Sequence, residues 1–117
     1  MRLLRLYIRE SKNICLTRNR YAKGCDIIDK YFPESELYNV PLDTQEQAMI
    51  QEAVELAKAS DIAILVLGGN EKTVREEFSR TNLDLCGRQQ QLLEAVYATG
   101  KPVILVMVDG RAATINW

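Results

Sequence analysis

The sequence predicts an α/β fold with a mostly parallel sheet, and two features carry this prediction. Residues 62–67 and 102–108 are continuous apolar runs, a pattern typical of parallel strands that are covered on both faces. Each run follows a segment with helical periodicity, so the order along the chain is helix, strand, loop, helix, strand. Parallel strands joined by a helix that covers their sheet define the α/β class.

The two predicted helices span residues 45–59 and 88–98. Asp43 or Thr44 can cap the start of the first helix, and Gly100 ends the second. Each helix has one apolar face, formed by Ile50, Ala53, Val54 and Ala57 in the first and by Leu92, Leu93, Val96 and Tyr97 in the second.

Residues 1–20 form a basic N-terminal region, which we separate from residues 21–117. Six Lys and Arg and one Glu give this region a charge of about +5. Residues 2–11 are predicted to be helical with a solvated charged face, and residues 13–17 to form a short strand. A membrane-surface or nucleic-acid helix is the alternative reading of such a basic start. The connection over residues 26–42 contains two prolines and is expected to run along the surface.

The composition describes one modest domain and excludes several kinds of chemistry. The 117 residues are 47% hydrophobic and 26% charged, which suits a soluble domain that buries roughly two thirds of its unfolded surface. The net charge of −1 argues against a nucleic-acid partner. The chain has no histidine, which excludes Ser/His/Asp and Cys/His triads and histidine zinc sites. Acid/base chemistry therefore has to come from carboxylates or lysines.

The cysteines indicate free thiols. Cys15, Cys25 and Cys86 form no CxxC pair and have no metal-ligand spacing, so we expect neither a disulfide framework nor a metal site. No apolar stretch has the form of a signal peptide or approaches the ~18 residues of a membrane span. We therefore expect no membrane-spanning segment in this chain.

Charged loops follow both predicted strands. Ligands of open parallel sheets collect beyond the carboxyl ends of the strands, where residues 68–70 and 109–111 stand. The first loop runs to about Gly87, far longer than the ~2 to 6 residues that a strand-to-helix connection needs. Its carboxylates lie among Lys72, Arg75 and Arg80, and they are Glu71, Glu76, Glu77 and Asp84.

These carboxylates are candidates for general acid/base chemistry. The alternative is a solvated loop that is held by surface salt bridges. Gly68 and Gly69 belong to neither a GxGxxG nor a GxxxxGK[ST] motif, and acidic residues follow them. We therefore expect no nucleotide or other cofactor.

The sequence resembles the C-terminal α/β sandwich domain of glycoside hydrolase family 3, which includes β-glucosidases and β-xylosidases. The resemblance starts at about Tyr21 and continues through VELAKASDIAILVLGGNE, REEFSRTNLDLCGRQ, LLEAVYATGKPVILVMVDGR and INW. The combined spacing of SRTNLDL, GRQ and TGKPVILV is specific. The resemblance implies a three-layer αβα sandwich with a mostly parallel, flavodoxin-like sheet, incomplete in this chain.

The resemblance also implies part of a retaining β-glycosidase that acts on terminal non-reducing β-linked glucose or xylose. In such enzymes a separate N-terminal TIM-barrel domain carries the aspartate nucleophile, and this domain supplies the acid/base glutamate. The family glutamate precedes an arginine by four positions, which gives Glu76 when counted back from Arg80, with Glu77 as runner-up. Arg80 is expected to anchor the loop by pairing with a carboxylate such as Asp84 or with a backbone carbonyl.

Three positions depart from the family pattern. Cys86 stands where proline is common, Glu77 where many members have glycine, and Ser79 where many have aspartate. Cys86 is expected to pack at the start of the following helix. The other two departures leave open which of the adjacent glutamates faces the sugar.

A TIM barrel takes ~250 residues, more than this chain contains, so we expect a fragment of a larger enzyme that is inactive by itself. Its expected partners are a carbohydrate and the barrel domain of the same full-length chain, with a homodimer through an unpaired sheet edge as a further expectation. We expect the full-length enzyme to be periplasmic or secreted. The alternative from another class is a non-catalytic flavodoxin-like binding or regulatory module, but the long acidic loop favours the enzyme.

Overall fold

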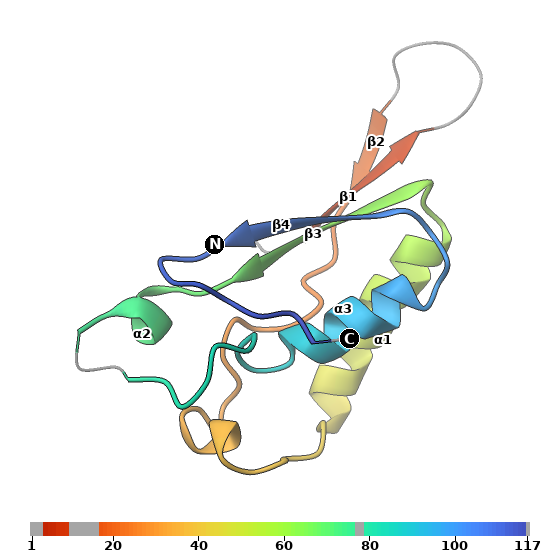
Figure 1. Cartoon of the computed structure of the whole chain (residues 1–117). Helices are drawn as coiled ribbons and strands as arrows, with labels where there is room; N and C mark the ends of the chain where they lie inside the picture. The colour runs from red at the N-terminus through yellow and green to blue at the C-terminus, as the bar shows by residue number, and fades with distance from the viewer. Residues whose placement is uncertain (1–3, 10–16, 77–78, 117) are drawn as a thin grey trace.

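A mixed sheet is the centre of the structure. A computed structural model describes residues 4–9, 17–76 and 79–116, and in these residues the sheet has four strands in the order β2-β1-β3-β4 (Figure 1). The strands are β1 Leu4–Arg9, β2 Thr17–Arg20, β3 Ile62–Gly68 and β4 Val103–Val108. β3 and β4 are parallel, and β1 is antiparallel to both β2 and β3. The α/β class is confirmed, and the parallel pair lies where the two apolar runs predicted it.

Two helices pack against one face of this sheet. α1 Thr44–Lys58 and α3 Gln89–Tyr97 lie on the same side of β3 and β4 (Figure 1). Asp43 caps α1, because its carboxylate accepts a hydrogen bond from the amide of Glu46 at 2.8 Å while the Glu46 carboxylate accepts one from the amide of Asp43 at 2.9 Å. The core between helices and sheet contains Ile50, Ala53, Ala57, Leu65, Leu67, Leu92, Leu93 and Val96. Tyr97 is 58% exposed at the end of α3, so its predicted place in the apolar stripe is wrong.

The predicted helix over residues 2–11 is also wrong, because Leu4–Arg9 is a strand in the middle of the sheet. Leu4, Leu6 and Ile8 alternate with other side chains, and this period of two favours a strand. β1 also hydrogen-bonds on both sides, to β2 and β3, which a helix could not do. Of the predicted strand over residues 13–17, only Thr17 lies within the described residues, and β2 begins there.

Two short helices interrupt the segments that were predicted to be loops. α2 Glu71–Val74 follows β3 directly, and the 3-10 helix η1 Glu34–Glu36 lies in the connection before α1. Both are remote from the β1–β2 hairpin (Figure 1). The connection over residues 26–42 lies only partly on the surface. Asp29 is buried and accepts hydrogen bonds from the Ser35 hydroxyl and the Tyr31 amide.

The opposite face of β3 and β4 is apolar and is not covered by any described helix. Ile64 and Val66 are half-buried, and their partners Ile104 and Val106 are 50% and 40% exposed. The described residues therefore form two layers of the three-layer αβα sandwich that the family resemblance implies, which is incomplete in this chain.

The end of β3 tolerates only glycine, which yields a stability prediction. Gly68 has a φ of 141°, and a Cβ on it would lie 2.0 Å from the carbonyl oxygen of Val108. We expect Gly68→Ala to lower the free energy of unfolding by more than about 3 kcal/mol, because both the backbone and the neighbouring strand would have to move. The measurement is urea denaturation followed by circular dichroism.

Gly100→Ala is the matched control. Gly100 also has a positive φ, 73°, but a Cβ on it meets nothing within 4 Å. It should cost only about 1–2 kcal/mol, from the left-handed conformation alone. Equal losses in the two variants would contradict the steric role of Gly68.

Candidate functional site

The carboxyl ends of β3 and β4 bring the two charged loops to one edge of the sheet. The amide of Gly69 donates a hydrogen bond to the carbonyl of Val108 at 3.0 Å. A Cβ on Gly69 would lie only 2.9 Å from a carboxylate oxygen of Asp109, so the second loop lies directly against the first. This is the edge where open parallel sheets bind their ligands.

Gln89, the first residue of α3, holds the end of β3 in place. Its side chain is fully buried. Its Oε1 accepts a hydrogen bond from the Gly68 amide at 2.7 Å, and its Nε2 donates to the carbonyls of Gly68 at 2.8 Å and of Ile27 at 2.9 Å. One amide thus joins β3, α3 and the segment after β2, and it fixes where the charged loop leaves the sheet.

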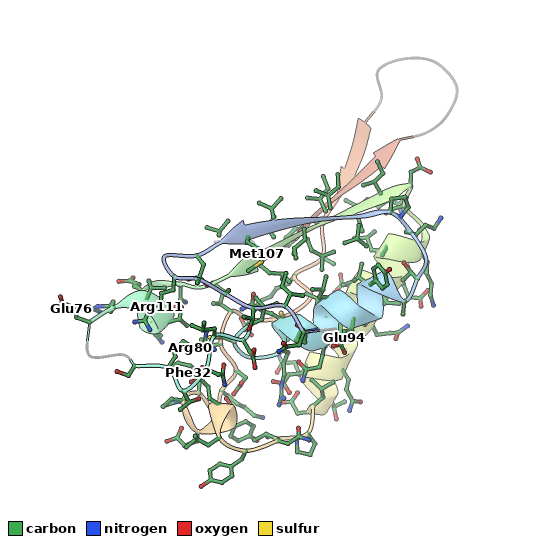
Figure 2. All side chains as sticks on the ribbon, viewed as in Figure 1. Phe32, Glu76, Arg80, Glu94, Met107 and Arg111 are labelled. Carbon is green, nitrogen blue, oxygen red and sulfur yellow. The ribbon has the colours of Figure 1, made fainter. Side chains whose placement is uncertain are left out.

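Glu76 lies in the part of the loop over residues 68–87 that is farthest from the sheet (Figure 2). Asn70 caps α2 with a capping box shared with Thr73, and the chain then passes through Arg75 to Glu76. Nη2 of Arg111 donates a hydrogen bond to the carbonyl of Arg75 at 3.2 Å. Figure 2 shows Glu76 projecting from the outer end, with Arg111 beside α2.

The side chain of Glu76 is exposed, and within the described residues it forms no hydrogen bond or ion pair. Glu77, the runner-up, lies outside the described residues. The catalytic role of either glutamate stays a prediction.

Arg80 is held by a carboxylate that the sequence analysis missed. Its Nε donates to Oε1 of Glu36 in η1 at 2.5 Å, and the side chains of Arg80 and Glu36 are 10% and 7% exposed. Its Nη2 donates to the backbone carbonyl of Asp84 at 2.7 Å. Oε2 of Glu36 accepts from the amide and the hydroxyl of Thr81, both at 3.3 Å. We call Glu36, Arg80 and Thr81 the clamp.

Asp84 connects the loop to the end of the chain rather than to the Arg80 guanidinium. Its Oδ1 accepts hydrogen bonds from the Thr114 hydroxyl at 2.6 Å and from Nδ2 of Asn116 at 2.8 Å. The amide of Thr114 donates to the carbonyl of Leu83 at 2.7 Å. The hydrogen bonds from Thr114 and Asn116, in that order, lower the pKa of the Asp84 carboxyl below its usual range.

A second buried ion pair holds the start of α3. Nε of Arg88 donates to Oε1 of Glu46 at 3.1 Å, and the remaining guanidinium nitrogens donate to the carbonyls of Val40 and Pro41. Both side chains are buried. Removing one partner of such a pair typically costs 3–5 kcal/mol, so this pair fixes α3 to the start of α1.

Four residues that help to hold this edge are not among the candidates from the sequence: Glu36, Glu46, Arg88 and Gln89. The GRQ motif was the available signal for Arg88 and Gln89, because both polar side chains stand at the start of an otherwise amphipathic helix. Glu36 and Arg80 are 44 positions apart, and no periodicity connects them.

The cysteines of the described residues are free and buried. Burial raises the pKa of the Cys25 thiol to about 12 and that of Cys86 to about 11. A nucleophilic cysteine needs the thiolate, which neither residue provides near neutral pH.

Within residues 4–9, 17–76 and 79–116, no three or more Cys, Asp or Glu side chains are grouped so that they could hold a metal ion. No helix in this part of the chain has the length and apolarity to cross a membrane.

The fold and the site thus define an α/β domain. A charged loop is held at the edge of its sheet where the parallel strands end. The profile of the glycosyl hydrolase family 3 C-terminal domain matches residues 7–117. The chain belongs to this family, as the motifs predicted.

The curated relatives are glycosidases. The chain is 41% identical to a β-xylosidase of Formosa agariphila over 97 residues, and 42% identical to a periplasmic β-glucosidase of Salmonella typhimurium over 96 residues. These matches cover 83% and 78% of this chain. An exo-α-(1→6)-L-arabinopyranosidase of Bifidobacterium longum is 35% identical over 67% of the chain. The chain spans only 11%, 12% and 10% of the length of these three relatives.

The hydrogen bonds to Asp84 predict that the loss of stability in Thr114→Val, relative to the parent, depends on pH. Because the folded-state pKa of Asp84 is lowered, its ionised form stabilises the fold above the unfolded pKa of about 3.9, and this contribution is lost as the pH falls through the folded pKa. Thr114→Val removes the hydroxyl hydrogen bond to Asp84, which is the larger cause of its lowered pKa. We expect the variant to have a lower urea midpoint than the parent at pH 6, with the difference shrinking steadily below about pH 5.

Thr99→Val is the control for this comparison. The Thr99 hydroxyl donates to the backbone carbonyl of Val96, which does not titrate. Its effect on the urea midpoint should be constant between pH 6 and pH 3. A constant effect of Thr114→Val over the same range would contradict the linkage to Asp84.

Proposed function

We propose that this chain is part of a retaining β-glycosidase and that it supplies the acid/base residue Glu76. The observation that supports this most is the placement of an exposed glutamate, without a side-chain partner among the described residues, between two restrained positions. Arg111 holds the backbone on one side of it and the clamp holds the other side. A buried, ion-paired carboxylate could not reach a substrate, whereas Glu76 is exposed at the ligand-binding edge.

The proposed chemistry needs two carboxyl groups, of which this chain contributes one. In a retaining glycosidase the acid protonates the leaving oxygen while a second carboxylate, about 5–5.5 Å away, attacks the anomeric carbon. The first residue then takes a proton from the water that hydrolyses the glycosyl-enzyme intermediate. We place the attacking aspartate on a TIM-barrel domain of the longer protein, which packs against the edge that presents Glu76.

The substrate class we propose is terminal non-reducing β-linked glucose or xylose. The β-xylosidase and β-glucosidase relatives support this choice. The longer enzyme is proposed to be periplasmic or secreted, since one relative is a periplasmic β-glucosidase.

Glu76 is chosen over Glu77 because of its distance in sequence from Arg80. It stands four positions before Arg80 and directly follows Arg75, whose carbonyl Arg111 holds. Variants at the two positions separate the alternatives.

Glu76→Gln in the full-length enzyme that contains this chain should lower kcat by about 10²–10⁴-fold on methyl β-glycosides. The alkoxide leaving group is poor and needs the proton that Gln cannot supply. On 2,4-dinitrophenyl β-glycosides the glycosylation step should be nearly unaffected, because this leaving group departs without protonation. Stopped-flow release of dinitrophenolate measures that step, and azide should rescue the turnover of Glu76→Ala.

Glu77→Gln is the matched control, with the same charge change at the adjacent residue. It should lower kcat by less than about threefold on both substrates. If Glu77→Gln shows the leaving-group dependence and Glu76→Gln does not, the roles are exchanged. Equal, mild effects at both positions would contradict an acid/base role for this loop and would favour the non-catalytic module.

The 117-residue chain by itself should release no nitrophenol from aryl β-glucosides or β-xylosides. The physical reason is that the proposed nucleophile belongs to another domain, so the anomeric carbon is not attacked. The assay is absorbance at 400 nm over a day against a buffer blank. Turnover that copurifies with the chain and disappears in Glu76→Gln would contradict the proposal.

A further inference from the structure

We propose that Glu36 is a positioning residue that sets the place of the Glu76 carboxylate through Arg80. The inference rests on the proposed function of Glu76, and it assigns a role to a residue of η1 that takes no part in the chemistry. Glu36 lies 40 positions before Glu76 in the sequence and meets the loop only because the connection before α1 folds back along it.

The contacts of Glu36 use both of its oxygens. Oε1 accepts from Nε of Arg80 at 2.5 Å, and Oε2 accepts from the amide and hydroxyl of Thr81 at 3.3 Å. Sγ of Cys86 lies 3.9 Å from Oε1. The carboxylate therefore holds two consecutive residues of the loop, Arg80 by its side chain and Thr81 by both its backbone amide and its hydroxyl.

Burial makes this contact hard to replace. Only 7% of the Glu36 side chain and 10% of the Arg80 side chain are exposed, so removing the carboxylate leaves a guanidinium that is largely shielded from water without its charged partner. Arg80 also donates to the carbonyl of Asp84 at 2.7 Å. Without Glu36, the Arg80 guanidinium keeps only neutral acceptors. We expect its side chain to turn toward solvent, so that it no longer restrains the loop.

Glu76 lies between two anchors that come from different parts of the chain. Arg75, immediately before it, is held by Arg111 from the loop after β4. Arg80, four positions after it, is held by Glu36 from η1. Figure 2 shows Arg111 against α2 and Arg80 below it, with Glu76 beyond both at the outer end. Loss of either anchor lets the carboxylate move while leaving the strands in place.

A small movement matters because proton transfer needs the acid within hydrogen-bond reach of the leaving oxygen. A displacement of about 1 Å can cost about 10²-fold in rate. The clamp therefore affects the step that uses the proton more than the binding of the sugar. This separates a positioning role from a general effect on folding.

Glu36→Gln in the full-length enzyme tests the proposal. The substitution keeps the size of the side chain but turns one acceptor into an NH2 group, which would face a donor on Arg80 or Thr81. We expect kcat on methyl β-glycosides to fall by about 10–100-fold with KM changed less than threefold. The rate of dinitrophenolate release from 2,4-dinitrophenyl β-glycosides should stay within threefold of the parent.

Glu34→Gln is the matched control, because Glu34 is in the same 3-10 helix and its side chain is exposed. It should leave both rates within twofold of the parent. If Glu36→Gln lowers both rates equally, or lowers neither, the positioning role is overturned. An equal loss would mean that Glu36 only keeps the enzyme folded.

Hydrogen exchange on the 117-residue chain provides a readout that does not depend on catalysis. The amide of Thr81, which donates to Oε2 of Glu36, should exchange at least tenfold faster in Glu36→Gln than in Glu34→Gln, while the amides of β3 are unchanged. Unchanged exchange at the Thr81 amide overturns the clamp. If Glu76→Gln shows no leaving-group dependence but the Thr81 amide does exchange faster, the proposed function fails and Glu36 still positions the loop.

Discussion

The buried side-chain amide of Gln89 is the interaction on which the rest of the edge depends. It bonds both the amide and the carbonyl of Gly68 and also reaches the carbonyl of Ile27. A buried amide that satisfies backbone groups from two segments gives a unique arrangement, because any shift leaves polar groups without partners. The end of β3, the start of α3 and the segment before η1 therefore have one relative position. The charged loop leaves the sheet from that fixed point.

Largely buried ion pairs hold this edge together, and Glu76, the proposed acid/base residue, is exposed. Glu46 and Arg88 are buried, the side chains of Glu36 and Arg80 are 7% and 10% exposed, and each arginine also donates to a backbone carbonyl. Such groups are costly to separate, so they restrain the loop on both sides of Asp84. Glu76 has no such partner in the described residues and is exposed. This contrast between ion-paired carboxylates and the exposed Glu76 suits the proposed site, which a separate domain would complete. A residue that acts across an interface has to be accessible to the other domain.

Particular residues show how far sequence reasoning reached. The apolar runs predicted β3, β4 and their parallel pairing, and the helical stripes predicted α1 and α3, because these signals are local and periodic. The prediction of a helix over residues 2–11 is wrong, since a segment as short as Leu4–Arg9 fits both the helical and the strand period. The carboxyl-edge rule placed Gly68 and Asp109 together, whereas the partner of Arg80 lies 44 positions away. No periodicity or motif in a single sequence indicates a contact between residues so far apart.

By itself the sequence determined the class, the family and the candidate carboxylates, because apolar periodicity and motif spacing are properties of the chain. The tertiary structure decided which carboxylates are structural, and it added Glu36, which is not among those candidates. Glu36 became an anchor because the connection before α1 folds it against Arg80, where both charges are shielded from water. Asp84 became a link to the C-terminal segment through Thr114 and Asn116. Glu76 is exposed, and Arg111 binds the backbone carbonyl of the residue before it, while no side chain among the described residues pairs with its carboxylate.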